Sequence, residues 1–149
     1  MGSMRKSSTS KPERRRQDST NFATLAAKSP FIQGWRIECL SEGGGRARLR
    51  MPVLEAHQNS IGTVHGGVLA ALADTACGIA YLSLAAPGSG FVTANLNINY
   101  IGAPAGDFIE ASAEVVASRK RMAFAEVVLT DASGAQVAHA TAVFYVSAP

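Results

Sequence analysis

The longest apolar stretch of the chain spans residues 68–86 and is interrupted by Asp74, Thr75 and Ser83. Its apolar positions surround the whole circumference of the predicted helix instead of forming one stripe, which is typical of a helix enclosed by other protein. The internal polar residues and the many alanines and glycines make it a poor membrane span. We therefore predict a buried central helix that ends at Pro87-Gly88.

Six other segments have the period-two alternation, or the β-branched and aromatic content, that is typical of strands. The clearest alternation lies in residues 92–100, where apolar residues alternate with Thr and Asn. The glycines at positions 43–45 and the Asp-Ala-Ser-Gly sequence at 131–134 predict tight turns. The predicted strands are residues 35–40, 46–51, 92–100, 108–118, 122–130 and 135–146.

The order of these elements indicates an α+β protein. A short helix is predicted at residues 22–28 before a break at Pro30, and residues 52–63 form a polar loop before the long helix. Because no helical pattern separates the strands that follow the long helix, we expect them to form an antiparallel meander. This sheet should curve around the central helix.

Composition and charge limit the possible domain organisation. The chain has 149 residues, of which 47% are hydrophobic, and this suits one domain. The formal net charge of +3 originates in residues 1–20, which hold six basic and two acidic residues, while residues 21–149 hold eight basic and nine acidic ones. We therefore predict a disordered basic tail at residues 1–20 and one folded domain at residues 21–149 that does not bind nucleic acid.

The cellular compartment is predicted from two features. The first residues lack the apolar core of a secretory signal, and Cys39 and Cys77 are too few for a disulfide framework. Both cysteines are expected to act as small hydrophobic residues. We expect a cytoplasmic protein that is not attached to a membrane.

Candidate catalytic groups lie at the start and in the middle of the predicted long helix. His65-Gly66-Gly67 leads into the helix, and Asn59 lies six residues before His65. A helix N-terminus offers unpaired N–H groups and a positive dipole end to a developing oxyanion, and glycine leaves the backbone accessible. Asp74 is the strongest signal, because a carboxylate inside an apolar helix is costly to desolvate unless it is paired or used.

The segment from Asn59 to Gly67, with Asp74 nine residues after His65, resembles the hot-dog-fold acyl-CoA thioesterases of the phenylacetate-pathway type. The resemblance covers about residues 30–147. It implies a hot-dog fold, in which an antiparallel sheet wraps around one helix, and hydrolysis of an acyl-CoA thioester to a free acid and coenzyme A.

The same resemblance implies roles for individual residues. Asn59, His65 and Gly66 would hold the thioester carbonyl, and Gly67 would contact the substrate. Asp74 would activate water or attack the carbonyl directly. Thr93 matches a hydroxyl residue that helps to place the water.

The separation of these residues predicts an oligomer. Asp74 lies eight residues beyond Gly66, which corresponds to about 12 Å along a helix. One small carbonyl cannot contact both groups, so if both serve one reaction the second must come from another subunit. We therefore predict a homodimer with two equivalent sites, and the resemblance implies that such dimers often pair into homotetramers.

Coenzyme A carries phosphates, so a basic cluster is expected near the mouth of the site. Arg119-Lys120-Arg121, at the turn between two predicted strands, is the best candidate. A solvated hairpin turn explains these charges nearly as well.

Other interpretations stay open. His65 could brace its loop, Asn59 could be a turn residue, and Asp74 could be a buried partner of another group. A Cys77 nucleophile is disfavoured because no His is spaced to activate it, and no His pair has ligand spacing, so we expect no metal and no cofactor. The alternative functions are an acyl-thioester dehydratase or hydratase and a non-catalytic acyl-CoA-binding module, while RNA binding would depend on the tail alone.

Overall fold

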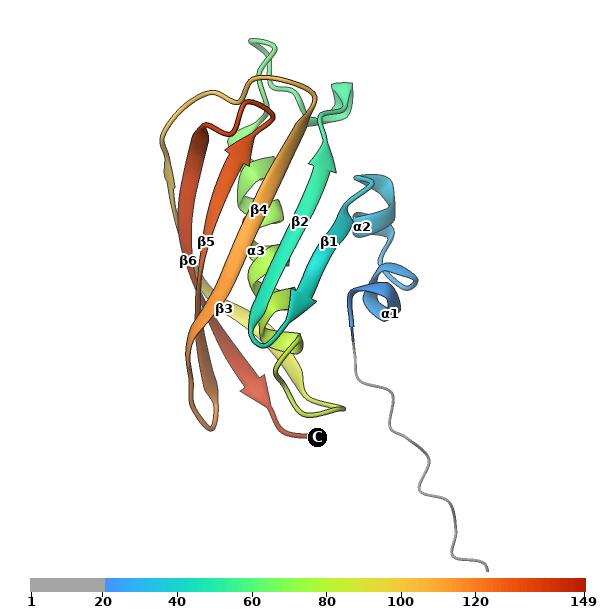
Figure 1. Cartoon of the computed structure of the whole chain (residues 1–149), viewed down its shortest axis with the longest axis vertical. Helices are drawn as coiled ribbons and strands as arrows, with labels where there is room; N and C mark the ends of the chain where they lie inside the picture. The colour runs from blue at the N-terminus through green and yellow to red at the C-terminus, as the bar shows by residue number, and fades with distance from the viewer. Residues whose placement is uncertain (1–20) are drawn as a thin grey trace, which may run out of the picture.

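A curved antiparallel sheet wraps around one long helix in the computed structural model of this protein, which describes residues 21–149 (Figure 1). The predicted α+β architecture is confirmed, and the predicted tail at residues 1–20 lies outside the described residues. The helical elements are α1 (Phe22–Ala26), α2 (Pro30–Gly34), the 3-10 turn η1 (Glu55–His57) and α3 (Gly66–Leu82). The strands are β1 (Glu38–Gly43), β2 (Arg46–Pro52), β3 (Gly90–Tyr100), β4 (Phe108–Ser118), β5 (Met122–Asp131) and β6 (Gln136–Ser147).

The strand order in the sheet is β1-β2-β4-β5-β6-β3. β4, β5 and β6 form the expected meander of consecutive antiparallel neighbours. β3 departs from it, because it precedes β4 in the chain yet pairs with β6, with Thr93 opposite Phe144. Residues 101–107 therefore carry the chain across the end of the sheet, and β3 becomes an edge strand.

The first predicted strand was misplaced, and the short helix that begins at Pro30 was not predicted. β1 begins at Glu38, because Trp35 still caps α2 and Arg36 adopts a left-handed backbone with φ of 53°. The predicted break after the first helix is present, since α1 ends at Ala26, but Pro30 also begins a second helix. It is the first residue of α2, where its missing N–H has no helical partner to lose.

The ends of the other helical elements also differ from the prediction. The loop predicted at residues 52–63 contains η1. α3 ends at Leu82, several residues before Pro87. Ser83 explains this end, because its hydroxyl donates to the Ala80 carbonyl at 2.7 Å and accepts the Gly45 N–H at 2.9 Å, which fixes the chain next to the β1–β2 turn.

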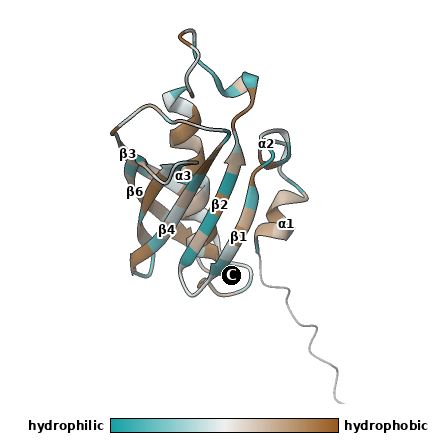
Figure 2. Ribbon diagram, turned by 45° about the horizontal axis from the view of Figure 1, so that its top comes forward, coloured by the Kyte–Doolittle hydropathy of each residue, from teal (hydrophilic) through white to brown (hydrophobic). Residues whose placement is uncertain are grey.

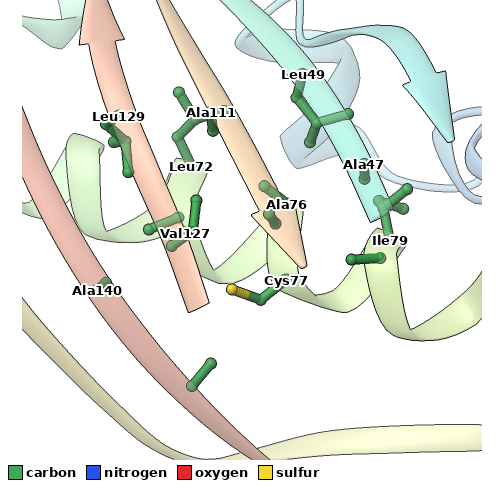
Figure 3. Packing of buried hydrophobic residues seen from close by; sticks show 14 of the residues in the cluster. Ala47, Leu49, Leu72, Ala76, Cys77, Ile79, Ala111, Val127, Leu129 and Ala140 are labelled. Carbon is green, nitrogen blue, oxygen red and sulfur yellow. The ribbon is translucent and has the colours of Figure 1, made fainter. Parts of the chain in front are cut away.

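The core lies between α3 and the inner face of the sheet (Figure 3). Leu72, Ala76 and Cys77 of α3 are fully buried there. The facing strand residues are largely small, which lets the helix pack close to the sheet; they include Ala47, Ala111, Ala113, Ala125 and Ala140. Within residues 21–149, none of the helices has the length and apolar character needed to cross a membrane.

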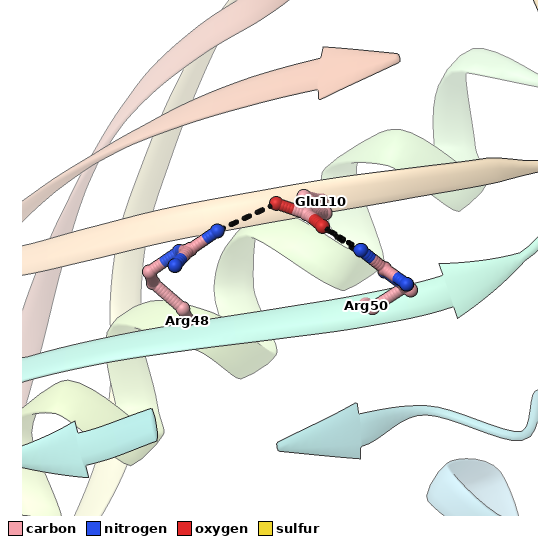
Figure 4. A network of polar contacts seen from close by, with 3 residues as sticks. All are labelled: Arg48, Arg50 and Glu110. Carbon is pink, nitrogen blue, oxygen red and sulfur yellow. Dashed lines mark hydrogen bonds and ion pairs between the residues drawn. The ribbon is translucent and has the colours of Figure 1, made fainter. Parts of the chain in front are cut away.

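The outer face of the sheet is polar over β2 and β4, and the alternating colours along β2 show the period-two pattern (Figure 2). Arg48 and Arg50 both donate to the Glu110 carboxylate, Arg48 at 2.9 Å (Figure 4). The hydrogen bond from Arg50, followed by that from Arg48, lowers the pKa of Glu110. This network covers the sheet on the side away from α3.

Asp131 is a buried carboxylate, 5% exposed, that organises the predicted turn between β5 and β6. Its Oδ1 accepts hydrogen bonds from the Ser133 hydroxyl at 2.6 Å and the Ser133 N–H at 2.9 Å. Its Oδ2 accepts the Ala105 N–H at 2.9 Å, which ties the β3–β4 connection to the turn. The Ser133 hydroxyl, followed by the Ala105 N–H, holds the pKa of Asp131 below its ordinary value.

We expect Asp131→Asn to lower the free energy of unfolding at neutral pH and to change its pH dependence. Because the folded-state pKa is lowered, the contribution of Asp131 is complete above the unfolded-state pKa of about 3.9 and is lost as pH falls through the lower folded value. Urea unfolding of both proteins between about pH 6 and about pH 3 should show their stability difference shrinking toward acid. Glu110 is common to both proteins and cancels, so a pH-independent difference would contradict this role.

Candidate active site

Asp74 and Thr93, which are separated by 19 positions in the sequence, meet in the structure. Asp74 lies in the middle of α3 and is half-buried, and Thr93 lies near the start of β3. The Thr93 hydroxyl donates a hydrogen bond to Asp74 Oδ1 at 2.8 Å. One carboxylate oxygen is thereby held in place, and Oδ2 is left for a water or a substrate.

Asp74 lies on the side of α3 that the sheet does not cover. The helix positions that are not buried recur at the spacing of one helical face; they are Gly66, Gly67, Ala70, Ala71, Asp74 and Thr75. The sequence predicted a helix enclosed on every side, but residues 21–149 enclose only part of it. Asp74 therefore avoids full desolvation and stays accessible to a ligand.

His65 is the N-cap of α3. Its Nδ1 accepts the Gly67 N–H at 2.8 Å, and its carbonyl oxygen accepts the N–H groups of Val68 and Leu69. Among residues 21–149, the N–H of Gly66 has no acceptor. The His65 imidazole therefore stabilises the start of α3, and the Gly66 N–H is the donor of the first turn that stays free.

The side-chain oxygen of Asn59 stabilises the loop before α3. Its Oδ1 accepts the N–H groups of Ile61 at 3.0 Å and Thr63 at 3.2 Å, and its own N–H donates to the Thr63 carbonyl at 2.8 Å. The side-chain amide nitrogen has no acceptor within residues 21–149. It can therefore donate to a bound carbonyl.

Two side chains that the sequence did not single out complete this region. The Tyr100 hydroxyl donates to the Gly66 carbonyl at 2.8 Å, and its ring lies 3.2 Å from where a Gly66 Cβ would be. His57 is 1% exposed, packs on Trp35 with ring centroids 5.0 Å apart, and accepts the His65 N–H at its carbonyl. The sequence signal for Tyr100 was its position as an aromatic residue at the end of an alternating strand. No feature of the sequence distinguished His57.

The glycine pair is required partly by its own neighbours. A Cβ at Gly67 would lie 3.0 Å from His65 Nδ1, and one at Gly66 would press on Tyr100. Packing against His65 and Tyr100 is therefore a reason for glycine at these two positions, in addition to the substrate access that the sequence suggested.

The predicted residues fall into two groups within one chain. Asp74 lines a cavity of about 300 Å³ together with residues of α1, α2 and β3. Gly66 lines a different cavity of about 320 Å³, bounded by Tyr100 and by residues 101–104. Neither cavity includes the residue that defines the other.

The basic residues Arg119, Lys120 and Arg121 lie at the exposed turn between β4 and β5. Arg119 and Lys120 line a third cavity of about 210 Å³, which contains none of the predicted catalytic residues. No carboxylate within residues 21–149 forms a salt bridge with them. Met122 lies opposite Tyr145, which lies opposite Val92, so the turn is about 10 Å across the sheet from the start of β3.

The alternative chemistries find little support in the geometry. Burial, followed by the negative charges of Asp74 and Glu126, raises the pKa of Cys77 to about 12, which keeps it a thiol. The side-chain hydrogen bond of Asp74 within residues 21–149 goes to Thr93 and not to a histidine. No group of three or more metal-ligating side chains lies together in that part of the chain.

Comparison with known proteins gives consistent matches. Residues 61–138 match the family described as "Thioesterase superfamily". Human "Acyl-coenzyme A thioesterase 13" is 37% identical over 99 residues, which cover 64% of this chain and 69% of the human protein. The Escherichia coli PaaI protein of the phenylacetic acid degradation operon superposes with a TM-score of 0.77 at 25% identity, covering 84% of this chain and 89% of PaaI. The BH2602 protein of Bacillus halodurans, solved with CoA, has a TM-score of 0.73 at 29% identity and covers 84% and 82%.

We expect His65→Ala to lower the free energy of unfolding by about 1 kcal/mol, because the first turn of α3 loses its cap. His65→Asn should recover most of this loss, since asparagine also accepts at an N-cap. Urea unfolding of the three proteins at one pH measures both effects. Equal stability of wild type and His65→Ala would mean that the Nδ1 contact with Gly67 does not stabilise the helix.

Proposed function

The chain belongs to the thioesterase superfamily, and on that premise we propose that it hydrolyses acyl-coenzyme A thioesters to a free acid and coenzyme A. Membership confirms the predicted hot-dog fold and the predicted enzyme class, a thioester hydrolase. The name of the human relative and the CoA in the BH2602 structure support the acyl-CoA substrate. The observation that carries the proposal is the Asp74–Thr93 pair, held at 2.8 Å on the open side of α3 where it lines a cavity.

The proposed reaction uses groups that the fold leaves free. Attack on the thioester carbon builds negative charge on its oxygen, and the Gly66 N–H, the Asn59 side-chain amide and the positive end of α3 can stabilise that charge. Asp74 Oδ2 either takes a proton from the attacking water or attacks the carbon itself. The C–S bond then breaks, and the thiolate of coenzyme A leaves and takes a proton. If Asp74 has attacked directly, water then hydrolyses the resulting mixed anhydride, which releases the free acid and restores the carboxylate.

We propose that the working unit is a two-fold homodimer. Asp74 and Gly66 line separate cavities in one chain, so a shared site needs a second subunit. β3 is an 11-residue edge strand whose outer side is unpaired within the described chain. Such an edge is normally covered, and its exposed Val92 and Tyr100, 63% and 53% accessible, favour covering by protein.

Side-by-side pairing of two β3 strands would also cover the open side of α3. The two strands run antiparallel about a two-fold axis, so Thr93 of one subunit approaches the far half of the partner's β3, beside which the partner's helix start lies. Asp74 then faces a Gly66 from the other chain. Pairing of dimers into tetramers stays a prediction from the resemblance, as does the cytoplasmic location.

The Arg119–Arg121 turn is the proposed contact for the phosphates of coenzyme A. Its support is the absence of a carboxylate partner within residues 21–149 and its position near the end of the sheet where β3 starts. The runner-up functions, a dehydratase or hydratase and a non-catalytic binding module, lack a specific observation in their favour. A dehydratase would need an acid or base histidine beside Asp74, where the structure places Thr93.

The variant Asp74→Asn tests the catalytic carboxylate, because it keeps the shape of the side chain and removes its basicity. If Asp74 is the base or nucleophile, kcat for acyl-CoA hydrolysis should fall by on the order of 10²–10⁴ while KM changes little. Thiol release measures the rate, and thermal unfolding controls for folding. A folded variant that keeps at least about a third of the wild-type kcat would remove Asp74 from the mechanism.

Mixing two inactive variants tests whether the active site is shared between subunits. Asp74→Asn and Gly66→Val should each be inactive, the latter because its side chain blocks the donor and presses on Tyr100. After subunits are mixed and exchanged, hybrid dimers should each regain one intact site, up to about half of the wild-type sites per hybrid. Separate affinity tags prove the exchange. No recovery in proven hybrids would mean that each chain holds a complete site.

A further inference from the structure

His57 is a buried titratable side chain to which the proposed reaction gives no role. It is the last residue of η1 and is 1% exposed. Its Nδ1 accepts the Leu54 N–H at 3.2 Å, and its Nε2 has no hydrogen-bond partner within residues 21–149. Because Nδ1 accepts a hydrogen bond, the proton of the neutral ring is assigned to Nε2. The fold thus uses His57 in its neutral form.

The backbone of His57 closes the loop that leads into α3. Its carbonyl accepts the His65 N–H at 2.8 Å, which joins the two ends of the loop. Asn59 lies two residues after His57, and Gly66 directly follows His65. Both donors that the proposed reaction offers to the oxyanion, the Asn59 amide and the Gly66 N–H, are therefore attached to the residues of this one contact.

We propose that His57 is a positioning residue, whose neutral ring keeps the Asn59 amide and the Gly66 N–H directed at the thioester oxygen and whose protonation releases them. The inference rests on the proposed function, because it concerns the oxyanion site of that reaction. The ring fixes η1 through the Leu54 N–H, and the His57 carbonyl fixes the base of the loop. His57 acts through the loop and not on the substrate.

Protonation of the ring would place a proton on Nδ1, opposite the Leu54 N–H. The acceptor would become a donor, and this hydrogen bond would be lost. The charged ring would also lie buried without a carboxylate, since none of the salt bridges within residues 21–149 includes His57. Burial lowers the pKa of His57, and the Pro52 carbonyl opposes this in part. The neutral ring is therefore the form that the fold stabilises.

The charged and titratable residues on the elements around His57 do not supply a partner for the charged ring. Four of the five are exposed, so solvent screens them, and Arg50 is paired with Glu110. None of the five is among the causes of the pKa shift of His57. They are Arg36 next to Trp35, Arg50 of β2, Glu55 of η1, His65 at the start of α3, and Asp107 before β4.

Trp35 offers a direct signal for the charge of His57. It is the only tryptophan of the chain, and its ring centroid lies 5.0 Å from that of His57. A protonated imidazole in contact with an indole quenches the indole fluorescence, whereas a neutral imidazole does so much less. The emission of Trp35 therefore reports the protonation of His57 without any substrate.

The test compares His57→Phe and His57→Asn with wild type in the full chain. His57→Phe keeps a ring against Trp35 but removes the acceptor. At about pH 8 it should lower kcat for acyl-CoA hydrolysis at least about tenfold with little change in KM, because misplaced oxyanion donors lose transition-state stabilisation. His57→Asn places an acceptor oxygen near the position of Nδ1 and should restore kcat to within about threefold of wild type. Thermal unfolding shows that each variant is folded in the assay.

His139→Asn is the matched control. His139 is half-buried in β6 and lines a hollow with Glu114 and Glu126, away from the loop before α3. The same substitution there should leave kcat, KM and their pH dependence unchanged. A decrease in kcat equal to that of His57→Phe would mean that loss of a histidine, and not its position, lowers activity.

The pH dependence distinguishes positioning from a contribution to stability alone. Because the folded-state pKa of His57 is lowered, the ratio of wild-type kcat to that of His57→Asn should be constant above the ordinary value of about 6.5 and should fall toward about pH 5. Asp74 is common to both proteins and cancels in the ratio. Trp35 emission should fall over the same range in wild type and not in His57→Asn. A ratio that stays constant to about pH 5 would overturn release on protonation.

The outcomes separate this inference from the proposed function. If wild type hydrolyses acyl-CoAs and folded His57→Phe keeps its kcat, His57 is not a positioning residue and the proposed function stands. If wild type hydrolyses no acyl-CoA, the proposed function fails, and amide hydrogen exchange at His65 tests the loop alone. Exchange should then be faster in His57→Phe than in His57→Asn at one pH, and equal exchange would overturn the inference. Should His57→Phe fail to fold, the pH dependence of the kcat ratio between wild type and His57→Asn decides.

Discussion

The chemistry of this protein depends on α3 being packed against the sheet on one side only. The buried side consists of small and branched apolar residues facing an alanine-rich sheet, and a carboxylate there would lose its hydration without compensation. Asp74 lies on the other side, where Thr93 supplies a hydrogen bond at 2.8 Å and a cavity keeps the group accessible. One helix can thus provide both the core of the fold and the carboxylate that we propose to be reactive.

The loop before α3 divides its polar atoms between structure and binding. The His65 Nδ1 and the Asn59 side-chain oxygen Oδ1 accept backbone N–H groups and hold the loop in one conformation. The Gly66 N–H and the Asn59 amide nitrogen are left as donors. The bracing bonds are made within the chain itself, so they orient these donors, and stabilisation of an oxyanion requires oriented donors.

The sequence predicted most of the fold, and it failed where local pattern carries no information. Period-two alternation and an all-apolar helix located the sheet, α3 and Asp74. The pairing of β3 with β6 could not be predicted, because strand partners depend on how residues 101–107 cross the sheet. The helix predicted at residues 22–28 corresponds to α1, but α2, which spans a single turn, is too short to show a helical period, so the wall that the two helices build beside Asp74 was missed. Tyr100 and His57 were missed because their roles depend on contacts with other segments.

Two surfaces that residues 21–149 leave uncovered are adjacent, and the proposed dimer accounts for both. Within this part of the chain the outer side of β3 is unpaired, and the helix face that carries Asp74 is open beside it. In the proposed dimer one contact would cover both and would bring Asp74 to a helix start that its own chain places too far away. Association would then complete the active site as well as the sheet. Because the partner in this proposed dimer would supply chemical groups and not only buried area, a weakened β3 contact would remove activity before it removed the fold.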